Sequence, residues 1–173
     1  MERLTISSLS LKSASNVSIC LVNLTRTTAA ASMLQVNITG SGLSNAALGA
    51  LRLDLGAQNL TLVLTSTVIS NNSATGDDGS GLHISLSGTS IATIDVAQCS
   101  WQDHVSAVAV HFTSSASNNL TANWVETSFL RNIGALLAEG NAQAWNFSGC
   151  TWKNNSSPNG GAGVSAQNMI DAQ

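Results

Sequence analysis

Apolar and polar residues alternate with a period of two along most of the chain. The clearest runs are 34–38, 51–55 and 82–86, in which Leu, Val or Ile occupies every second position. The alternation recurs at 108–112 and weakens at 136–138 and 164–166. A period of two is typical of β-strands with one buried face, and no stretch has the 3.6-residue period of an amphipathic helix. The pattern predicts an all-β fold.

A second set of alternating segments precedes a loose repeat. Strand-like runs at 59–64, 94–96 and 145–148 each lead into a four-residue segment that ends in Asn or a polar substitute. Six such segments occur, at 24–27, 42–45, 68–71, 101–104, 129–132 and 152–155. Their last residues lie 18, 26, 33, 28 and 23 positions apart, which suits coils with turns of variable length. We therefore expect a single domain, residues 1–173, of about six irregular coils stacked at about 4.8 Å per coil.

The last coil carries the most specific motif. Trp152-Lys153-Asn154-Asn155 is followed by Gly160-Gly161-Ala162-Gly163-Val164; residues 129–132 match the first half of this motif, and 79–82 approximate the second. The pattern resembles the Phe-x-x-Asn and Gly-Gly-Ala-[Ile/Leu/Val] repeats of polymorphic outer-membrane proteins and their algal look-alikes, within the pectate-lyase-like superfamily. The resemblance covers roughly residues 16–168. It implies a right-handed, single-stranded parallel β-helix, often at a cell surface, but it implies no single activity.

Neither end of the sequence has an evident polar cap, which a stack of coils requires. We therefore expect the chain to be a segment of a longer solenoid, with adjoining coils of the same protein as its neighbours.

Charge excludes several partners. Only 9% of the residues are charged and the net charge is −3, with six Lys and Arg residues. Such a chain offers no basic surface for nucleic acid or anionic lipid. It also lacks the roughly 18 to 20 consecutive apolar residues of a membrane span, and no signal peptide is evident at the start.

Asn-x-Ser/Thr sequons are frequent. They begin at Asn16, Asn23, Asn37, Asn59, Asn71, Asn119, Asn146, Asn154 and Asn155. Such sequons are glycosylation acceptors in secreted proteins, so they favour an extracellular or surface glycoprotein. The alternative is that Asn occurs here because it suits strand ends and turns.

The strongest catalytic candidates are Asp77, Asp78 and His83, which lie in or beside a Gly-rich segment. Polygalacturonases, which share the superfamily that this chain resembles, use clustered aspartates and a nearby histidine. However, Asp77 and Asp78 are consecutive, the Asn-Thr-Asp element of those enzymes is absent, and no Arg-x-Lys follows. A solvated turn is the simpler interpretation. Nor do the arginines form the Arg and Asp cluster of a calcium-dependent pectate lyase.

Strand alignment suggests a second group. It places Arg52 and His83 in one outward column and Asp54, Ser85, His111 and Glu139 in the next, which predicts that His111 lies near Glu139. A carboxylate beside a histidine can tune a proton donor or bind sugar hydroxyls, although solvated charge is the commoner role. Asp77, Asp78, His83, His111 and Glu139 are the candidate ligand-binding residues. Trp124 and Trp145 would stack on sugars only if they point outward.

The cysteines are predicted to be buried thiols. Positions two before each repeated segment hold small residues that would stack inside the coils: Val22, Gly40, Ser66, Cys99, Thr127 and Cys150. Cys99 and Cys150 would then be two coils apart, about 9.6 Å, which exceeds the reach of a disulfide, about 7 Å. Cys20 is interpreted in the same way. No metal or cofactor motif is recognisable.

These observations favour a non-enzymatic extracellular scaffold or adhesive module whose partners would be carbohydrates or other surface proteins. The alternative is a carbohydrate-active β-helix with catalytic residues partly outside this segment. A weaker alternative is an ice-binding solenoid, for which Thr65-Ser66-Thr67 is the only approach to a threonine array, and variable coil lengths would break its register.

Overall fold

The computed structural model describes residues 2–7, 10–12, 21–26, 33–56, 59–74, 79–87, 91–114, 119–140, 143–157 and 163–167. These residues form eighteen β-strands and no helix. The strands are β1 (Glu2–Ser7), β2 (Ser10–Lys12), β3 (Val22–Arg26), β4 (Met33–Thr39), β5 (Gly42–Ser44), β6 (Leu51–Leu55), β7 (Asn59–Thr65), β8 (Val68–Ser70), β9 (Leu82–Leu86), β10 (Ile91–Ala97), β11 (Ser100–Gln102), β12 (Val110–Ser114), β13 (Asn119–Val125), β14 (Ser128–Leu130), β15 (Leu136–Glu139), β16 (Gln143–Ser148), β17 (Thr151–Lys153) and β18 (Val164–Gln167).

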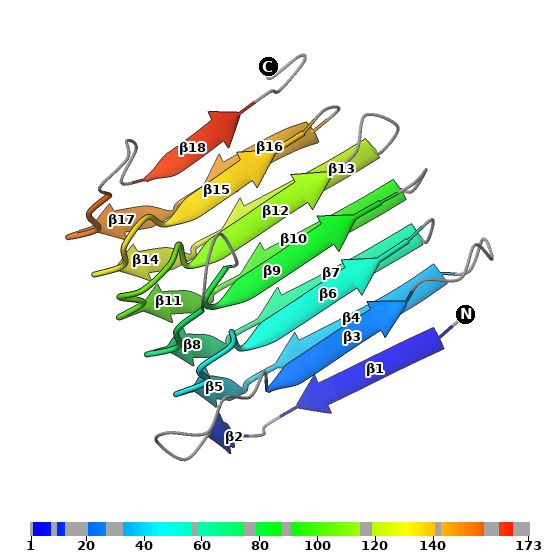
Figure 1. Cartoon of the computed structure of the whole chain (residues 1–173), viewed down its shortest axis with the longest axis horizontal. Coiled ribbons are helices and arrows are strands. Elements are labelled where there is room, and N and C mark those ends of the chain that lie inside the picture. Colours follow the sequence, from blue (N-terminus) through cyan, green and yellow to red (C-terminus); the bar gives the residue numbers. More distant parts are fainter. Residues whose placement is uncertain are drawn as a thin grey trace.

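The strands build three parallel sheets that run the length of the molecule (Figure 1). Every third strand belongs to the same sheet: β1-β4-β7-β10-β13-β16 form the first sheet, β2-β5-β8-β11-β14-β17 the second, and β3-β6-β9-β12-β15-β18 the third. Each group of three consecutive strands, such as β4 to β6, is one coil, and each strand pairs with its counterpart in the next coil. The predicted all-β parallel solenoid is confirmed. In the described part of the chain, no helix is long and apolar enough to cross a membrane.

Left-handed residues recur at two fixed places in each coil from β4 onward. The first follows the strand of the first sheet and the second follows the short strand of the second sheet, at Gly40 and Asn45, Ser66 and Asn71, Gln98 and Asp103, Glu126 and Arg131, and Gly149 and Asn154. Their φ angles lie between 48° and 63°. Gly, Asn and Asp adopt this conformation at the lowest cost, which explains much of the Asn and Gly in the turns.

The period of two is borne out by burial. In β4, β6, β7 and β10 every second side chain faces the interior, and Val36, Ile38, Leu53, Leu62 and Ile94 have no exposed surface. Inward columns of successive coils lie on one another, so each strand buries its apolar face against both neighbours. This burial is the main source of stability in such a stack.

The register of the second sheet differs in part from the prediction. Its central residues are Leu43, Ile69, Trp101, Phe129 and Trp152, which pair from coil to coil. The predicted segments that begin with Trp101, Phe129 and Trp152 are therefore correct. Those at 42–45 and 68–71 are wrong by one residue, since the bulky Val68 is 43% exposed and Ile69 is fully buried.

The first predicted segment, 24–27, is wrong altogether. Leu24 lies in β3, in the third sheet, where it pairs with Leu53. The second-sheet strand of that coil is β2, whose Leu11 pairs with Leu43. Both strands alternate in the same way, so the pattern alone did not distinguish one sheet from the other.

Small polar side chains stack inside the first corner. The column consists of Ser41, Thr67, Cys99, Thr127 and Cys150. The last three were predicted, whereas Val22, Gly40 and Ser66 of the predicted column do not belong to it. Each hydroxyl or thiol donates to the carbonyl two residues before it, as Thr67 does to Thr65 at 3.0 Å and Thr127 to Val125 at 3.0 Å. We call this column the hydroxyl ladder; it satisfies polar groups where the chain leaves the first sheet.

A second column lines the next corner. It consists of Asn72, His104, Asn132 and Asn155, each three residues after the central residue of its second-sheet strand, and we call it the asparagine ladder. Asn132 is typical: its amide nitrogen donates to the Trp101 carbonyl at 3.0 Å, and its Oδ1 accepts from the backbone N–H of His104 at 3.2 Å. Asn72 and Asn155 contact the coil before them in the same way. The ladder thus hydrogen-bonds backbone groups that the bend leaves unpaired.

Candidate functional site

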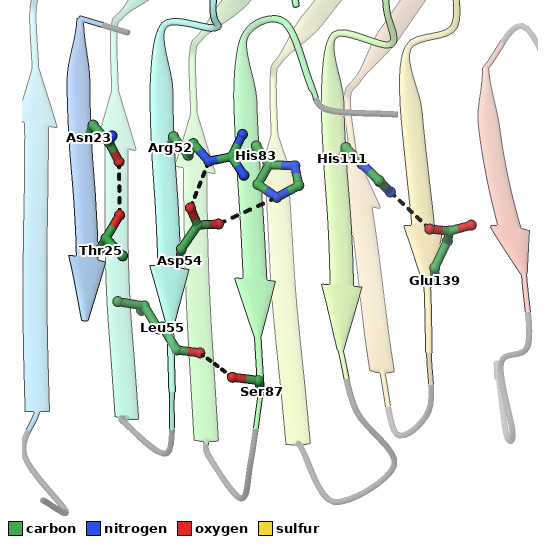
Figure 2. Close-up of polar contacts among 9 residues, drawn as sticks. All are labelled: Asn23, Thr25, Arg52, Asp54, Leu55, His83, Ser87, His111 and Glu139. Atoms are coloured by element: carbon green, nitrogen blue, oxygen red, sulfur yellow. Dashed lines mark hydrogen bonds and ion pairs between the residues drawn. The ribbon is translucent and has the colours of Figure 1, made fainter. Parts of the chain in front are cut away.

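Charged side chains gather on the outward face of the third sheet. Arg52 and Asp54 come from β6, His83 from β9, His111 from β12 and Glu139 from β15, and together they form a row across four neighbouring strands (Figure 2). Their positions follow from the period of two, since each alternates with a buried apolar residue of its own strand. We call these five residues the charged row.

The charged row contains two carboxylate–histidine contacts. Asp54 accepts from Arg52 Nε at 2.7 Å, and its other oxygen lies 3.6 Å from His83 Nε2. Glu139 Oε2 lies 3.0 Å from His111 Nε2. The two imidazole rings meet edge to face, with centroids 5.3 Å apart. Along the stack the two imidazoles therefore lie side by side between the carboxylates of Asp54 and Glu139.

Burial distinguishes the members of the row. His83 and His111 are buried, with 6% and 3% of their surfaces exposed, whereas the side chains of Arg52, Asp54 and Glu139 are about a third exposed. The imidazoles are thus held in place and the carboxylates meet solvent. His111 Nδ1 is buried and has no hydrogen-bond partner among the described residues.

The predicted contact between His111 and Glu139 is confirmed, but the predicted columns are not. His111 pairs with His83 and Leu137, so it belongs to the Arg52 column rather than to that of Asp54 and Glu139. It reaches Glu139 diagonally. The alignment failed because Val108 continues the alternation of the strand yet lies in the preceding turn, where its carbonyl accepts from the N–H of Ser80 at 2.8 Å.

Asp77 and Asp78, the other candidate residues, lie outside the described residues. Within the described part of the chain, no group of three or more His, Cys, Asp or Glu side chains could hold a metal ion. Asp54 and Glu139 share a column three strands apart, which corresponds to about 14 Å at 4.8 Å per strand. Glycosidase carboxyl pairs lie about 5 to 9.5 Å apart, so these two cannot act as such a pair.

The tryptophans do not provide an outward sugar platform. Trp124 is fully buried and its ring lies tilted against that of Phe129, with centroids 5.6 Å apart, so the predicted alternative of a core position is correct for it. Trp145 is half-buried and packs against the core, with its ring 4.9 Å from that of Phe112.

The threonine array predicted at 65–67 does not form on the surface. Thr67 of the 65–67 segment is fully buried in the hydroxyl ladder, and Ser66 is a turn residue. Variable coil length does not break the register, contrary to expectation. Thr61, Thr93 and Thr121 pair directly although their coils differ in length.

The cysteines in the described part of the chain are free. Cys99 is buried, as predicted, and burial raises the pKa of its thiol to about 11. Cys150 is only half-buried, because it lies in the last coil. Cys20 lies outside the described residues.

The sequon asparagines differ in accessibility. Those with exposed side chains are Asn23, Asn71, Asn119, Asn146 and Asn154, whereas Asn37, Asn59 and Asn155 are partly buried. Asn16 lies outside the described residues. Asn155 belongs to the asparagine ladder and donates its amide N–H to the Phe129 carbonyl at 3.0 Å. A glycan on this nitrogen would compete with that contact.

Comparison of the chain with protein families, with curated proteins and with solved structures finds no match.

Proposed function

We propose that this chain is a non-enzymatic β-solenoid module of a secreted or surface glycoprotein, which acts as a scaffold or adhesive segment through its long side faces. Its carbohydrate or protein partners would meet outward columns of short polar side chains, and adjoining coils of the same protein would extend the stack. The resemblance to pectate-lyase-like, right-handed repeats is part of this proposal.

The observation that carries the proposal is the presence of two columns of polar side chains inside the stack of coils. The asparagine ladder links every described second-sheet strand from β8 to β17 to the coil before it, and at the other end of these strands the hydroxyl ladder donates to carbonyls of its own coil. Such columns stabilise the geometry of a rod. The outward carboxylates of the charged row, by contrast, are too far apart for paired acid–base chemistry on a sugar.

Glycosylation is the first test. The chain is secreted from a eukaryotic host and the occupancy of each sequon is mapped by peptide mass spectrometry. We expect occupancy at exposed sites such as Asn119 and Asn146, and none at Asn155, because folding places the Asn155 amide in the ladder. An unmodified chain, or a folded chain with a glycan on Asn155, would contradict this part of the proposal.

Adhesion and turnover are tested together. We expect the secreted chain to be retained on immobilised polysaccharide and to release no reducing ends or unsaturated products from it. Failure to bind any surface polysaccharide or surface protein would remove the adhesive role.

The second candidate is a carbohydrate-active function centred on the charged row. It is favoured by the His111–Glu139 contact, in which a buried imidazole lies 3.0 Å from a solvent-facing carboxylate. Such a pair can transfer a proton to or from a bound hydroxyl. Product release that is lost in both His111→Gln and Glu139→Gln, but kept in the Asp95→Asn control on the first sheet, would establish this function instead.

A further inference from the structure

One member of the asparagine ladder is not an asparagine. His104 takes the place between Asn72 and Asn132, and none of its surface is exposed. Its backbone N–H donates to Asn132 Oδ1 at 3.2 Å, as the backbone of a ladder residue should. Its side chain, however, has different hydrogen-bonding groups from the amide that it replaces.

Both ring nitrogens of His104 face carbonyl oxygens. Nε2 lies 3.2 Å from the carbonyl of Ile69 and takes the role of the asparagine amide nitrogen. Nδ1 lies 3.2 Å from the carbonyl of Asn72. A neutral imidazole has one N–H and so can donate to only one of the two carbonyls, whereas an imidazolium could donate to both.

The charge of an imidazolium would nevertheless be poorly stabilised here. The residues hydrogen-bonded to His104 are Ile69 and Asn72 in the coil before it, at the ring, and Asn132 in the coil after it, at the backbone N–H; all three are uncharged. The charged group that acts on the ring is the Asp103 carboxylate at the surface, and Arg131 binds both of its oxygens at 2.6 and 2.8 Å. Because that carboxylate is already neutralised and exposed, it offers little to a buried cation.

Burial therefore outweighs the two carbonyls. It lowers the pKa of His104 to about 4, although the hydrogen bonds to Asn72 and Ile69 and the Asp103 charge act in the opposite direction. In the unfolded chain the same group would have a pKa of about 6.5. Between these values the unfolded chain binds a proton that the folded chain excludes, so stability is present above pH 6.5 and is lost as the pH falls toward 4.

We propose that His104 makes the solenoid acid-labile at one rung: acidification favours opening between the coil of β7 to β9 and the coil of β10 to β12, because His104 binds a proton more readily when the ladder is open than when its ring is buried among uncharged groups. The other described ladder members have no titratable side chain. The asparagine ladder therefore carries a single pH-sensitive position in the middle of the stack. This inference does not depend on the proposed scaffold function.

The chain contains three histidines, which allows a clean test. In a His83→Asn, His111→Gln background, His104 is the only histidine; adding His104→Asn gives the matched control and completes the ladder with an amide. Denaturant titrations of both proteins are compared at pH 7.5 and pH 4.5. The unfolding equilibrium constant of the single-histidine protein should rise on the order of 50- to 100-fold more than that of the control. Equal rises in the two proteins would overturn the proposal.

A second measurement needs no substitution at the ladder. The imidazole resonance of His104 in the folded single-histidine protein, or in the wild type if that background does not fold, should stay in its neutral form at pH 5.5. If this resonance instead titrated near pH 6.5 in the folded protein, the folded chain would not exclude the proton, and the proposal of an acid-labile rung would be refuted.

Discussion

Asn71 and Asn72 are consecutive, yet the structure gives them opposite roles, and this contrast provides a sharp prediction. Asn72 is buried in the asparagine ladder, where its Oδ1 accepts from the N–H of Ala46 at 2.8 Å and its Nδ2 donates to the carbonyl of Leu43 at 3.2 Å. Asn71 is exposed, and its side-chain amide donates to Oδ1 of the partly exposed Asn45 at 2.6 Å. The change from Asn to Asp in either residue keeps the shape of the side chain and replaces a donor with an acceptor.

We expect Asn72→Asp to destabilise the fold at pH 7 by about 3 kcal/mol or more. The Leu43 carbonyl would lose its donor, which costs roughly 1 to 3 kcal/mol for a buried group. Burial of the introduced carboxylate against that carbonyl adds a further penalty of several kcal/mol unless the carboxyl is protonated. Asn71→Asp should cost less than about 1 kcal/mol, because its hydrogen bond is exposed and Asp, like Asn, tolerates the left-handed backbone at this position.

The pH dependence of the difference identifies the cause. A protonated carboxyl can donate to the Leu43 carbonyl as the amide does, so burial and this bond raise the pKa of the introduced group above its unfolded value. The penalty should then be small below about pH 4, the unfolded value, and grow as the pH rises through the folded pKa. Urea titrations of wild type and both variants from pH 3.5 to 7.5 measure this difference. If Asn71→Asp proved the more damaging change, the one-residue register of the second sheet would be wrong.

Two further predictions concern the core and the thiols. Phe129→Ala should lower the free energy of unfolding by about 3 to 5 kcal/mol, because it empties a fully buried site within stacked rings. Asn132→Ala should lower it by about 2 to 3 kcal/mol, and Glu139→Gln by less than about 1 kcal/mol, since the Glu139 side chain is about a third exposed. Denaturant titration measures this order, and a larger effect of Glu139→Gln would contradict its outward position. At pH 8 an alkylating reagent should modify Cys150 well before Cys99. The pKa of about 11 lowers the thiolate fraction of Cys99 about 100-fold relative to a thiol with the usual pKa of 9.0. Equal rates of modification, measured by mass spectrometry of the native protein, would show that Cys99 is not buried.

The fold class could be predicted from the sequence because burial follows the period of two. Val36, Ile38, Leu62 and Ile94 alternate with polar neighbours and are all fully buried. A helix would have placed these residues on different faces, so the alternation alone excluded most other architectures. The parallel stack then followed from the absence of any other element between the strands.

Register was harder to predict, since it depends on turns. Val108 and Val110 both continue the alternation, but only Val110 belongs to the strand, because the backbone of Val108 bonds to Ser80 of the previous coil. Shifting the strand by two residues preserves which side chains face the core and changes which outward residues are neighbours. For this reason the contact between His111 and Glu139 was predicted while the column of His111 was not.

The structure also shows which part of the coil is constant. The left-handed residues on either side of the second-sheet strand lie five positions apart in all five coils from β4 onward: 40 and 45, 66 and 71, 98 and 103, 126 and 131, and 149 and 154. In the last four of these coils the residue directly after the second of them belongs to the asparagine ladder, and in all five the inward hydroxyl or thiol directly follows the first. By contrast, the distance from the ladder residue to the next third-sheet strand varies from four positions, 132 to 136, to ten, 72 to 82. Register survives irregular coil lengths because both corners of the second sheet are fixed by local conformation and by the ladders, while the added residues lie outside them.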